Sequence, residues 1–329
     1  MRTISELGEK KVIETIMECL DKTPDMPVPF GDDVSAVDLD LDRLAVVKTD
    51  MLVGKTDVPP SMSLRQAARK AVVMNISDFA AKGVKPLALL VALGLPKSFK
   101  EEDVRQIGLG LNEGAREYDA HVIGGDTNEA SDLIISCSLL GICPKHVLVK
   151  RSTARPGDIV VVTGSFGKTA SGLKILLEGL SAPETIKKTL TEAVLMPKAR
   201  LKEGLALAQS GALTASIDSS DGLAWSLYEL SDASNIGFTI DNIPIAPEAY
   251  EFAENCDLDP LELGLYGGEE YELIVTVKPE LWENAKRAVG NLRTPLTSIG
   301  RVTKEKKLEL KTEGRTRPIE RKGWEHFKT

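Results

Sequence analysis

The sequence is poor in the residues that build transition-metal sites and disulfide scaffolds. Its 329 residues include 3 histidines and 4 cysteines. The cysteines are scattered and form no Cys-x-x-Cys pair: Cys19, Cys137, Cys143 and Cys256. This usage argues against zinc knuckles and disulfide frameworks and favours a reducing, cytoplasmic location. The histidines are far apart and no Gly-x-Ser-x-Gly motif accompanies them, so a Ser-His-Asp hydrolase has no support.

Long apolar runs and an excess of basic residues are also missing. The longest apolar stretch, 87–95, is about half of what a membrane-spanning helix needs. Residues 1–10 carry charges where a signal peptide has an apolar core. The 41 Lys and Arg residues against 49 Asp and Glu residues give a formal net charge of −8. This balance argues against nucleic-acid binding. We therefore expect a cytoplasmic protein that binds neither membranes nor nucleic acids.

The apolar residues that are present predict two domains. They make up 42% of the chain, and a domain typically holds roughly 100–200 residues. We expect an N-terminal domain over 1–143 and a C-terminal domain over 144–329, joined in the polar segment 144–157. Strand and helix patterns mix in both halves, which indicates an α+β protein of two mixed α/β domains.

The periodicity of apolar residues predicts individual elements in both halves. Helices are expected at 4–20, at 63–82 with Ser63 as N-cap, and at 101–118. The expected strands are 34–39 and 44–49 as a hairpin, a buried strand at 87–95, then 121–123, 133–142, 159–163, 214–217, 272–277 and 296–302. The stretch 164–169 follows a strand as a P-loop would. However, Val162 stands where a P-loop needs glycine, so a strand-to-helix turn is the better interpretation.

A series of aspartates lies at the edges of these apolar elements. Asp50, Asp126 and Asp218 each follow a predicted strand, and strand ends on one side of a sheet are where α/β proteins assemble sites. Carboxylates that meet there repel one another unless cations lie between them, and oxygen ligands suit Mg²⁺. Together with the glycine-rich Gly124-Gly125-Asp126 stretch, they indicate magnesium-assisted phosphoryl transfer. Taken singly, each aspartate is also explained as a turn or helix-cap residue.

Seven short motifs occur in an order that resembles the thiamine-monophosphate kinases. They run from residue 31 to residue 327: Gly31-Asp32-Asp33, Thr49-Asp50-Met51-Leu52-Val53, Asn75-Ile76-Ser77-Asp78, Gly124-Gly125-Asp126-Thr127, Asp218-Ser219-Ser220-Asp221-Gly222-Leu223, Gly267-Gly268-Glu269-Glu270-Tyr271-Glu272-Leu273 and Gly323-Trp324-Glu325-His326-Phe327. The resemblance implies a two-domain fold of the aminoimidazole-ribonucleotide-synthetase superfamily and a homodimer whose N-terminal sheets pair into a barrel. It also implies the reaction of ATP with thiamine monophosphate to give thiamine diphosphate and ADP, with several Mg²⁺ ions.

The same resemblance implies roles for individual residues. The implied Mg²⁺ ligands are Asp33, Thr49 through its backbone, Asp50, Asp78, Asp126, Asp218 and Asp221. The implied ATP contacts are Gly125, Asp126, Arg151 and Ser220. The implied thiamine contacts are Glu269, which would counter the positive charge, and Trp324, which would stack on the cationic heterocycle. No side chain is assigned as nucleophile or general base.

Two positions depart from the family's pattern. Lys48 stands where the family commonly has serine, and an ammonium group cannot ligate Mg²⁺. One metal position is therefore lost, served by a backbone oxygen, or replaced by the lysine charge. Asp57 stands where the family often has a substrate-contacting histidine, and its carboxylate could meet the positive charge of thiamine.

Two alternative functions stay open at this point. The first is a sister enzyme of the same superfamily that acts on another small phosphate or carboxylate substrate. The reactive cysteine of selenophosphate synthetase, the C-terminal cysteine of the hydrogenase-maturation member and the phosphate loop of the purine enzyme are not found here. The second is a module that senses ATP–Mg²⁺ without turnover, which a broken set of aspartates would indicate. Both rank below the kinase.

Overall fold

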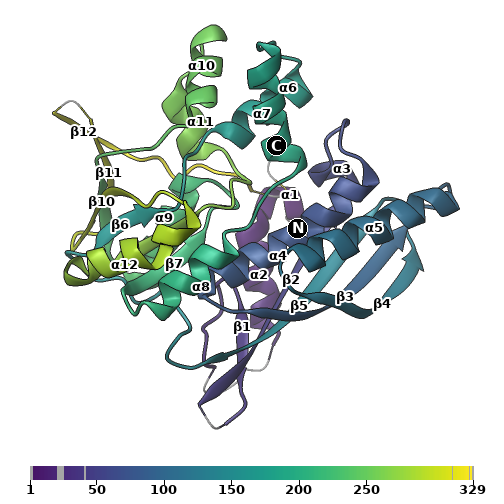
Figure 1. Cartoon of the computed structure of the whole chain (residues 1–329), viewed down its shortest axis with the longest axis horizontal. Helices are drawn as coiled ribbons and strands as arrows, with labels where there is room; N and C mark the ends of the chain where they lie inside the picture. The colour runs from purple at the N-terminus through teal and green to yellow at the C-terminus, as the bar shows by residue number, and fades with distance from the viewer. Residues whose placement is uncertain (1–2, 21–25, 41, 313, 326, 328–329) are drawn as a thin grey trace.

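Two mixed sheets organise the chain, as the computed structural model shows for residues 3–20, 26–40, 42–312, 314–325 and 327 (Figure 1). The first sheet has the strand order β1-β2-β5-β3-β4 and the second the order β12-β11-β8-β10-β6-β9-β7. Each contains antiparallel pairs and one parallel pair, β3 with β4 and β8 with β11. The expected α+β class with two mixed sheets is confirmed.

The elements of the first half surround the five-stranded sheet. They are α1 (Ile4–Leu7), α2 (Glu9–Glu18), β1 (Ser35–Asp38), β2 (Arg43–Val53), α3 (Gly54–Asp57), α4 (Leu64–Lys82), β3 (Pro86–Leu95), α5 (Glu101–Glu117), β4 (His121–Glu129) and β5 (Ile134–Pro144). The hairpin of β1 and β2 and the helices α4 and α5 lie where the sequence predicts them. The helix expected over 4–20 is divided at Gly8, whose φ of 74° separates α1 from α2.

The elements of the second half surround the seven-stranded sheet. They are β6 (Ile159–Val162), α6 (Lys168–Glu178), α7 (Glu184–Leu195), α8 (Leu201–Gln209), β7 (Leu213–Asp218), α9 (Leu223–Ser234), β8 (Gly237–Ile240), α10 (Pro247–Asn255), α11 (Pro260–Tyr266), β9 (Leu273–Val277), α12 (Trp282–Val289), β10 (Thr297–Thr303), β11 (Leu308–Thr312) and β12 (Arg315–Pro318), with short 3₁₀ turns at Pro279–Leu281 and Gly290–Leu292. The turn expected after β6 is present: Gly167, in the left-handed region, precedes α6.

Helix α4 lies between the two sheets and belongs to the packing of both. It begins with a capping box, in which Ser63 and Gln66 satisfy each other's backbone N–H groups, and it ends at Gly83 with φ 68°. One side packs on β2 and β5, and another packs on β7 and α8 (Figure 1). Most of its side chains are therefore buried, polar ones included. This position allows α4 to present functional groups between the two sheets.

The predicted strand ends at Thr49 and Ile123 are wrong. β2 continues to Val53 because it pairs with β5 along its whole length, and β4 continues to Glu129 because it pairs with β3. The Thr49-Asp50 pair and the Gly124-Gly125-Asp126 stretch therefore lie within strands. A Cβ atom on Gly125 would collide with the backbone of Val91, so glycine allows β4 to lie close against β3.

The two sheets differ in how their faces are covered. Helices α4 and α5 lie on one face of the five-stranded sheet (Figure 1). Its other face carries large exposed apolar side chains, including Val47, Met51, Leu90 and Leu140. The expectation of a wholly buried strand at 87–95 is therefore wrong for one face of β3. In the other sheet, β6 and β9 are buried at every position, since α4 packs on one face and α9 on the other. No helix in the described part of the chain is long and apolar enough to cross a membrane.

Candidate active site

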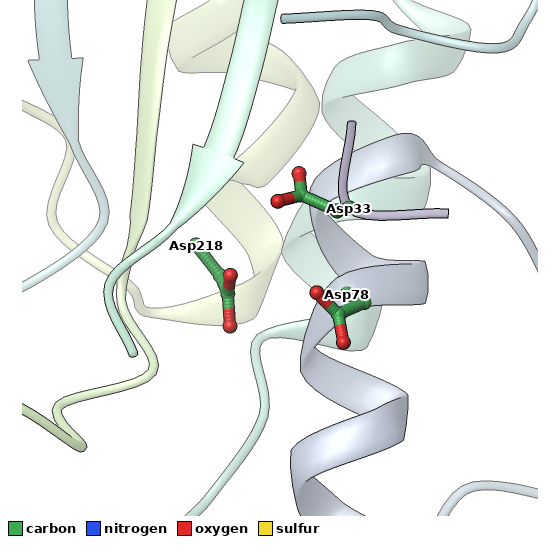
Figure 2. Close-up of side chains that lie close together, drawn as sticks. All are labelled: Asp33, Asp78 and Asp218. Atoms are coloured by element: carbon green, nitrogen blue, oxygen red, sulfur yellow. The ribbon is translucent and has the colours of Figure 1, made fainter. Parts of the chain in front are cut away.

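Three buried aspartates from distant parts of the chain meet between the sheets. Asp33 precedes β1, Asp78 lies on α4, and Asp218 is the last residue of β7. Figure 2 shows their carboxylates turned toward a common space. One carboxylate oxygen from each lies within 4.8 Å of the others. Three oxygen donors at this spacing fit a hard divalent cation such as Mg²⁺.

Neighbouring side chains of the same motifs hold these aspartates in place. The Ser77 hydroxyl donates to Asp218 Oδ2 at 2.5 Å and so ties α4 to the end of β7. The Ser226 hydroxyl donates to the Asp218 carbonyl at 3.0 Å. The Asn75 side chain accepts a hydrogen bond from the backbone N–H of Asp50 at 3.1 Å, which links α4 to β2. In the Asn75–Asp78 motif, Asn75 therefore holds β2 and Ser77 holds the end of β7, while Asp78 faces the cluster.

Asp33 is neutralised by cations of the chain itself. Lys82 lies 2.7 Å from Asp33 Oδ2 and 2.7 Å from Asp32 Oδ1, and it donates to the Ser216 carbonyl at 2.6 Å. Arg151 Nε donates to Asp33 Oδ1 at 2.8 Å, and its Nη2 also contacts that oxygen. Burial alone would raise the pKa of Asp33, but Arg151 and Lys82 outweigh it and hold the pKa below its usual value. The Arg151 guanidinium thus faces a carboxylate of the cluster.

A second lysine bridges two more of the predicted ligands. Lys48 Nζ lies 3.1 Å from Asp50 Oδ1 and 3.0 Å from Asp78 Oδ2. Lys48 and Asp50 are two residues apart on β2, so both side chains point to the face covered by α4. Burial opposes the positive charge of Lys48, but Asp78 and Asp50 outweigh it and raise the pKa of the ammonium group. A pocket of about 420 Å³ opens beside this group and is lined by Phe30, Asp33, Lys48 and Thr49, among others.

Negative charge remains in excess on the side of β7. Burial first, and the nearby charge of Asp33 second, raise the pKa of Asp218 to about 6. Burial and Asp218 raise the pKa of Asp221 to about 7. Burial also raises the pKa of Asp78 well above its usual value, with Lys48 opposing and Asp50 adding to the shift. Several buried carboxylates that resist ionisation together form a site that a divalent cation would complete.

The three C-terminal motifs meet directly after Asp218. The Glu269 N–H donates to the Ser220 carbonyl at 2.6 Å, and the Trp324 N–H donates to the Asp221 carbonyl at 3.1 Å. Glu269 has a φ of 63°, an uncommon conformation for a residue other than glycine. Trp324 is 54% exposed, so a role as an anchor of the apolar core does not apply. Asp221 makes no side-chain cap for α9, whose N-cap is Gly222.

Sequence reasoning missed a buried lysine beside the predicted substrate residues. Lys70, on α4, lies 2.5 Å from Glu269 Oε1 and donates to the Asp57 carbonyl at 3.0 Å. The Asp57 carboxylate itself accepts the Val53 N–H at 2.7 Å and so closes the short helix α3. Glu269 and Asp57 are thus brought together through Lys70. The sequence signal was weak, because Lys70 lies in a helical stretch between an arginine and an alanine.

Other predicted residues lie apart from the carboxylate cluster. Asp126 and Gly125 lie on β4, the exposed edge strand of the five-stranded sheet. The Thr49 hydroxyl donates to the Cys137 carbonyl at 3.1 Å and lies on the face of β2 opposite to Asp50. Their predicted roles toward Mg²⁺ and ATP stay predictions. His326, in the last motif, lies outside the described residues.

The chain is similar to known proteins over nearly its whole length. Residues 31–143 match the N-terminal domain of AIR synthase related proteins and residues 155–313 match their C-terminal domain. The chain is 36% identical to the thiamine-monophosphate kinase of Pyrococcus horikoshii over 327 residues, which are 99% of this chain and 98% of that relative.

The chain belongs to the thiamine-monophosphate kinase family.

Solved structures of this family agree with the fold. A structure described as AaThiL complexed with AMPPCP and TMP has a TM-score of 0.86 at 29% identity and covers 99% of both chains. The thiamine monophosphate kinase of Aquifex aeolicus has a TM-score of 0.80 at 27% identity, over 96% of this chain and 99% of that chain. The resemblance drawn from the seven motifs is therefore confirmed, and the sister branches of the superfamily are disfavoured.

Proposed function

We propose that this chain transfers the γ-phosphoryl group of ATP to thiamine monophosphate, which gives thiamine diphosphate and ADP. The observation that carries the proposal is the meeting of Asp33, Asp78 and Asp218 in a member of this kinase family. Their carboxylates have raised pKa values at Asp78 and Asp218, and their oxygen donors suit Mg²⁺. The AaThiL structure that contains AMPPCP and TMP is a close structural match and supports both substrates.

Mg²⁺ ions held here would neutralise the phosphate charges and draw the nucleotide and the acceptor phosphate together. On the protein side, Asp78, Asp218 and Asp221 would hold the ions, with Asp33, Asp50, Asp126 and the Thr49 backbone as further predicted ligands. The Lys82 and Arg151 contacts fix Asp33, so one wall of the site is already ordered. Gly125, Asp126, Arg151 and Ser220 are proposed to contact ATP.

The thiamine moiety is assigned to the loop that holds Glu269, together with Trp324 and Asp57. Backbone hydrogen bonds to the carbonyls of Ser220 and Asp221 hold this loop and Trp324 beside the proposed ligands Asp218 and Asp221. Glu269 would meet the positive charge of thiamine, and the exposed Trp324 indole offers a stacking surface. The acceptor phosphate is itself the nucleophile, so no nucleophilic side chain is required.

We also propose that two copies of the chain pair through the exposed face of the five-stranded sheet. Val47 and Leu140 lie opposite each other on β2 and β5 and are 41% and 39% exposed. A contiguous apolar face of this kind is typical of protein interfaces. The proposal predicts that Val47→Glu makes the dimer monomeric in sedimentation. The control is Leu177→Glu, at an exposed leucine on α6 in the other half, and it should leave the dimer intact.

The proposed domains are 1–143 and 144–329.

Turnover tests the proposed activity. Purified protein with ATP, Mg²⁺ and thiamine monophosphate should produce thiamine diphosphate and ADP in equal amounts, measured by chromatography. AMPPCP in place of ATP should give no product, since its γ-phosphoryl group cannot be transferred. Folded protein that binds ATP and forms no thiamine diphosphate would exclude the kinase and support the sensor of ATP–Mg²⁺.

A further inference from the structure

Lys48 forms an ion-pair bridge inside the proposed metal site. Its ammonium nitrogen lies between Asp50 Oδ1 at 3.1 Å and Asp78 Oδ2 at 3.0 Å. The side chains of Asp78, Lys48 and Asp50 are 9%, 21% and 29% exposed, so water screens the three charges only partly. The ammonium group thus fills the place between two carboxylates that a bridging cation would otherwise take.

The other lysine bridge in the site differs in its surroundings. Lys82 also joins two carboxylates, but it is 1% exposed and donates to the Ser216 carbonyl on β7 as well. That third contact ties Lys82 to the packing of α4 against the second sheet. Among the described residues, the ion pairs of Lys48 go to Asp50 and Asp78 alone. Lys48 also lines the open pocket beside Asp33 and Thr49. Lys82 is therefore part of the fold, whereas Lys48 borders this pocket.

A lysine and a divalent ion exclude each other at this pair of carboxylates. An ammonium group has three donors and no lone pair, so it cannot join the ligands of a metal. A divalent ion bound between Asp50 and Asp78 would lie against the positive charge of Lys48 and be repelled by it. One carboxylate oxygen each of Asp33, Asp78 and Asp218 lies within 4.8 Å of the others, so this cluster offers oxygen donors that do not depend on Asp50.

We propose that Lys48 serves as a tethered cation of the magnesium site: it neutralises the Asp50–Asp78 pair, so that this pair binds no divalent ion of its own. The inference rests on the proposed function, because it assumes Mg²⁺ at the Asp33–Asp78–Asp218 cluster. The lysine at position 48 left three possibilities for the nearby metal position: loss, a backbone oxygen as ligand, or replacement by the lysine charge. The inference selects the last of these. It also makes part of the site's positive charge independent of the Mg²⁺ concentration.

The number of bound ions tests this directly. Mn²⁺ binding to the full chain, counted by electron paramagnetic resonance with saturating AMPPCP, should give one more ion per chain in Lys48→Ala and Lys48→Ser than in the wild type. Lys48→Arg keeps the charge and should keep the wild-type number. The matched control is Lys145→Ala, which removes an exposed lysine–Asp38 pair of the same sheet and should change nothing.

Thermal unfolding gives a second measurement. Without metal, Lys48→Ala should lower the unfolding midpoint by about 3–5 °C, because Asp50 and Asp78 are left facing each other. Added Mg²⁺ should restore it. The double variant Lys48→Ala/Asp50→Asn removes the repulsion, so it should regain the wild-type midpoint and the wild-type number of ions.

The outcomes separate this inference from the proposed function. If Lys48→Ala and Lys48→Ser bind the same number of Mn²⁺ ions as the wild type, or fewer, Lys48 is not a substitute for a metal ion. If the wild type binds no Mn²⁺, the magnesium site itself is wrong and the inference falls with it. If Mn²⁺ binds as expected and no thiamine diphosphate forms, the proposed reaction fails while the role of Lys48 stands.

Discussion

The carboxylates on the two sides of the site differ in the charges that surround them. Asp33 contacts Arg151 and Lys82, and its pKa lies below the usual value. On the side of β7, the described residues form no ion pair with Asp218 or Asp221, and the pKa values of these groups are raised to about 6 and about 7. A buried charge is stable only when it is compensated. The contacts of Lys82 and Arg151 thus fix Asp33 in the fold at one wall of the proposed metal site, and Asp218 and Asp221 are the groups whose charge a bound cation would compensate.

Among the changes considered, removal of an uncompensated carboxylate should have the largest effect. That effect should be on turnover. Asp218→Asn or Asp221→Asn deletes a charged metal ligand, so kcat should fall roughly 10²-fold or more. The fold should be kept, and the metal-free protein should become more stable because a buried repulsion is relieved. Steady-state kinetics and thermal unfolding measure the two effects. Asp232→Asn, which alters an ion-paired aspartate of α9, is the control. Wild-type rates in both site variants would show that Asp218 and Asp221 have only structural roles.

Removal of a compensating cation should act on stability instead. Lys82→Met leaves Asp32 and Asp33 buried without their shared partner, and breaking a buried ion pair from one side typically costs about 3–5 kcal/mol. The free energy of unfolding in urea should drop by that amount with and without Mg²⁺. A loss that Mg²⁺ fully restores would contradict the assignment of Lys82 to the fold and would place Asp33 with the uncompensated group.

The pH dependence of stability should differ between the two sides. Asp218 and Asp221 have pKa values that are higher in the folded chain than the unfolded value of 3.8, so the folded state retains their protons longer. Their stabilising contribution is complete below pH 3.8 and is lost as the pH rises toward 7. The contribution of Asp33 depends on pH in the opposite direction. Its pKa is lowered in the folded chain, so its stabilising contribution is present at neutral pH and is lost only as the pH falls below 3.8.

The metal-free protein should therefore lose about 2–4 kcal/mol of stability between about pH 4 and pH 7 from the side of β7. Asp221→Asn should reduce this loss, and the stabilisation by Mg²⁺ should grow over the same range, because metal and protons compete for the same oxygens. Unfolding midpoints across this pH range, with and without Mg²⁺, measure both. Equal slopes for the wild type and Asp221→Asn would remove Asp221 from the uncompensated group.

The aspartates of the site could be predicted from the sequence more easily than the lysines that compensate them. The aspartates stand in short motifs whose order is recognisable, and Asp218 ends its strand as predicted. The Ser63 cap and the end of α4 are also local signals, so the helix that carries Asp78 was predictable. By contrast, Thr49-Asp50 lies inside β2 because β5 pairs along its whole length, and no local signal reports that pairing.

The lysines that compensate the carboxylates were not predictable in the same way. Lys48 meets Asp78 only because β2 packs on α4, and Lys82 meets Asp32 and Asp33 only in the folded chain. Lys70, in the first half of the chain, contacts Glu269, in the second half. Each of these contacts depends on the packing of segments that are far apart in sequence. A lysine in a helical stretch carries no mark of the carboxylate that it will face.

A change at Lys70 should have the smallest effect of those considered. It extends the comparison of compensated and uncompensated carboxylates to Glu269, in the proposed substrate site. Lys70 lies on α4, and its ammonium group forms an ion pair with Glu269 in the loop beside the end of β7. Lys70→Met should free Glu269 and weaken its positioning, so we expect KM for thiamine monophosphate to rise about 3- to 10-fold, or by roughly 1 kcal/mol, with little change in KM for ATP. Lys70→Arg should restore part of the loss, because the charge returns. The control is Lys174→Met, whose lysine pairs with Glu178 at the C-terminal end of α6. An equal rise in KM for both substrates would mean that Lys70 stabilises the fold as Lys82 does, and that Glu269 needs no partner of its own.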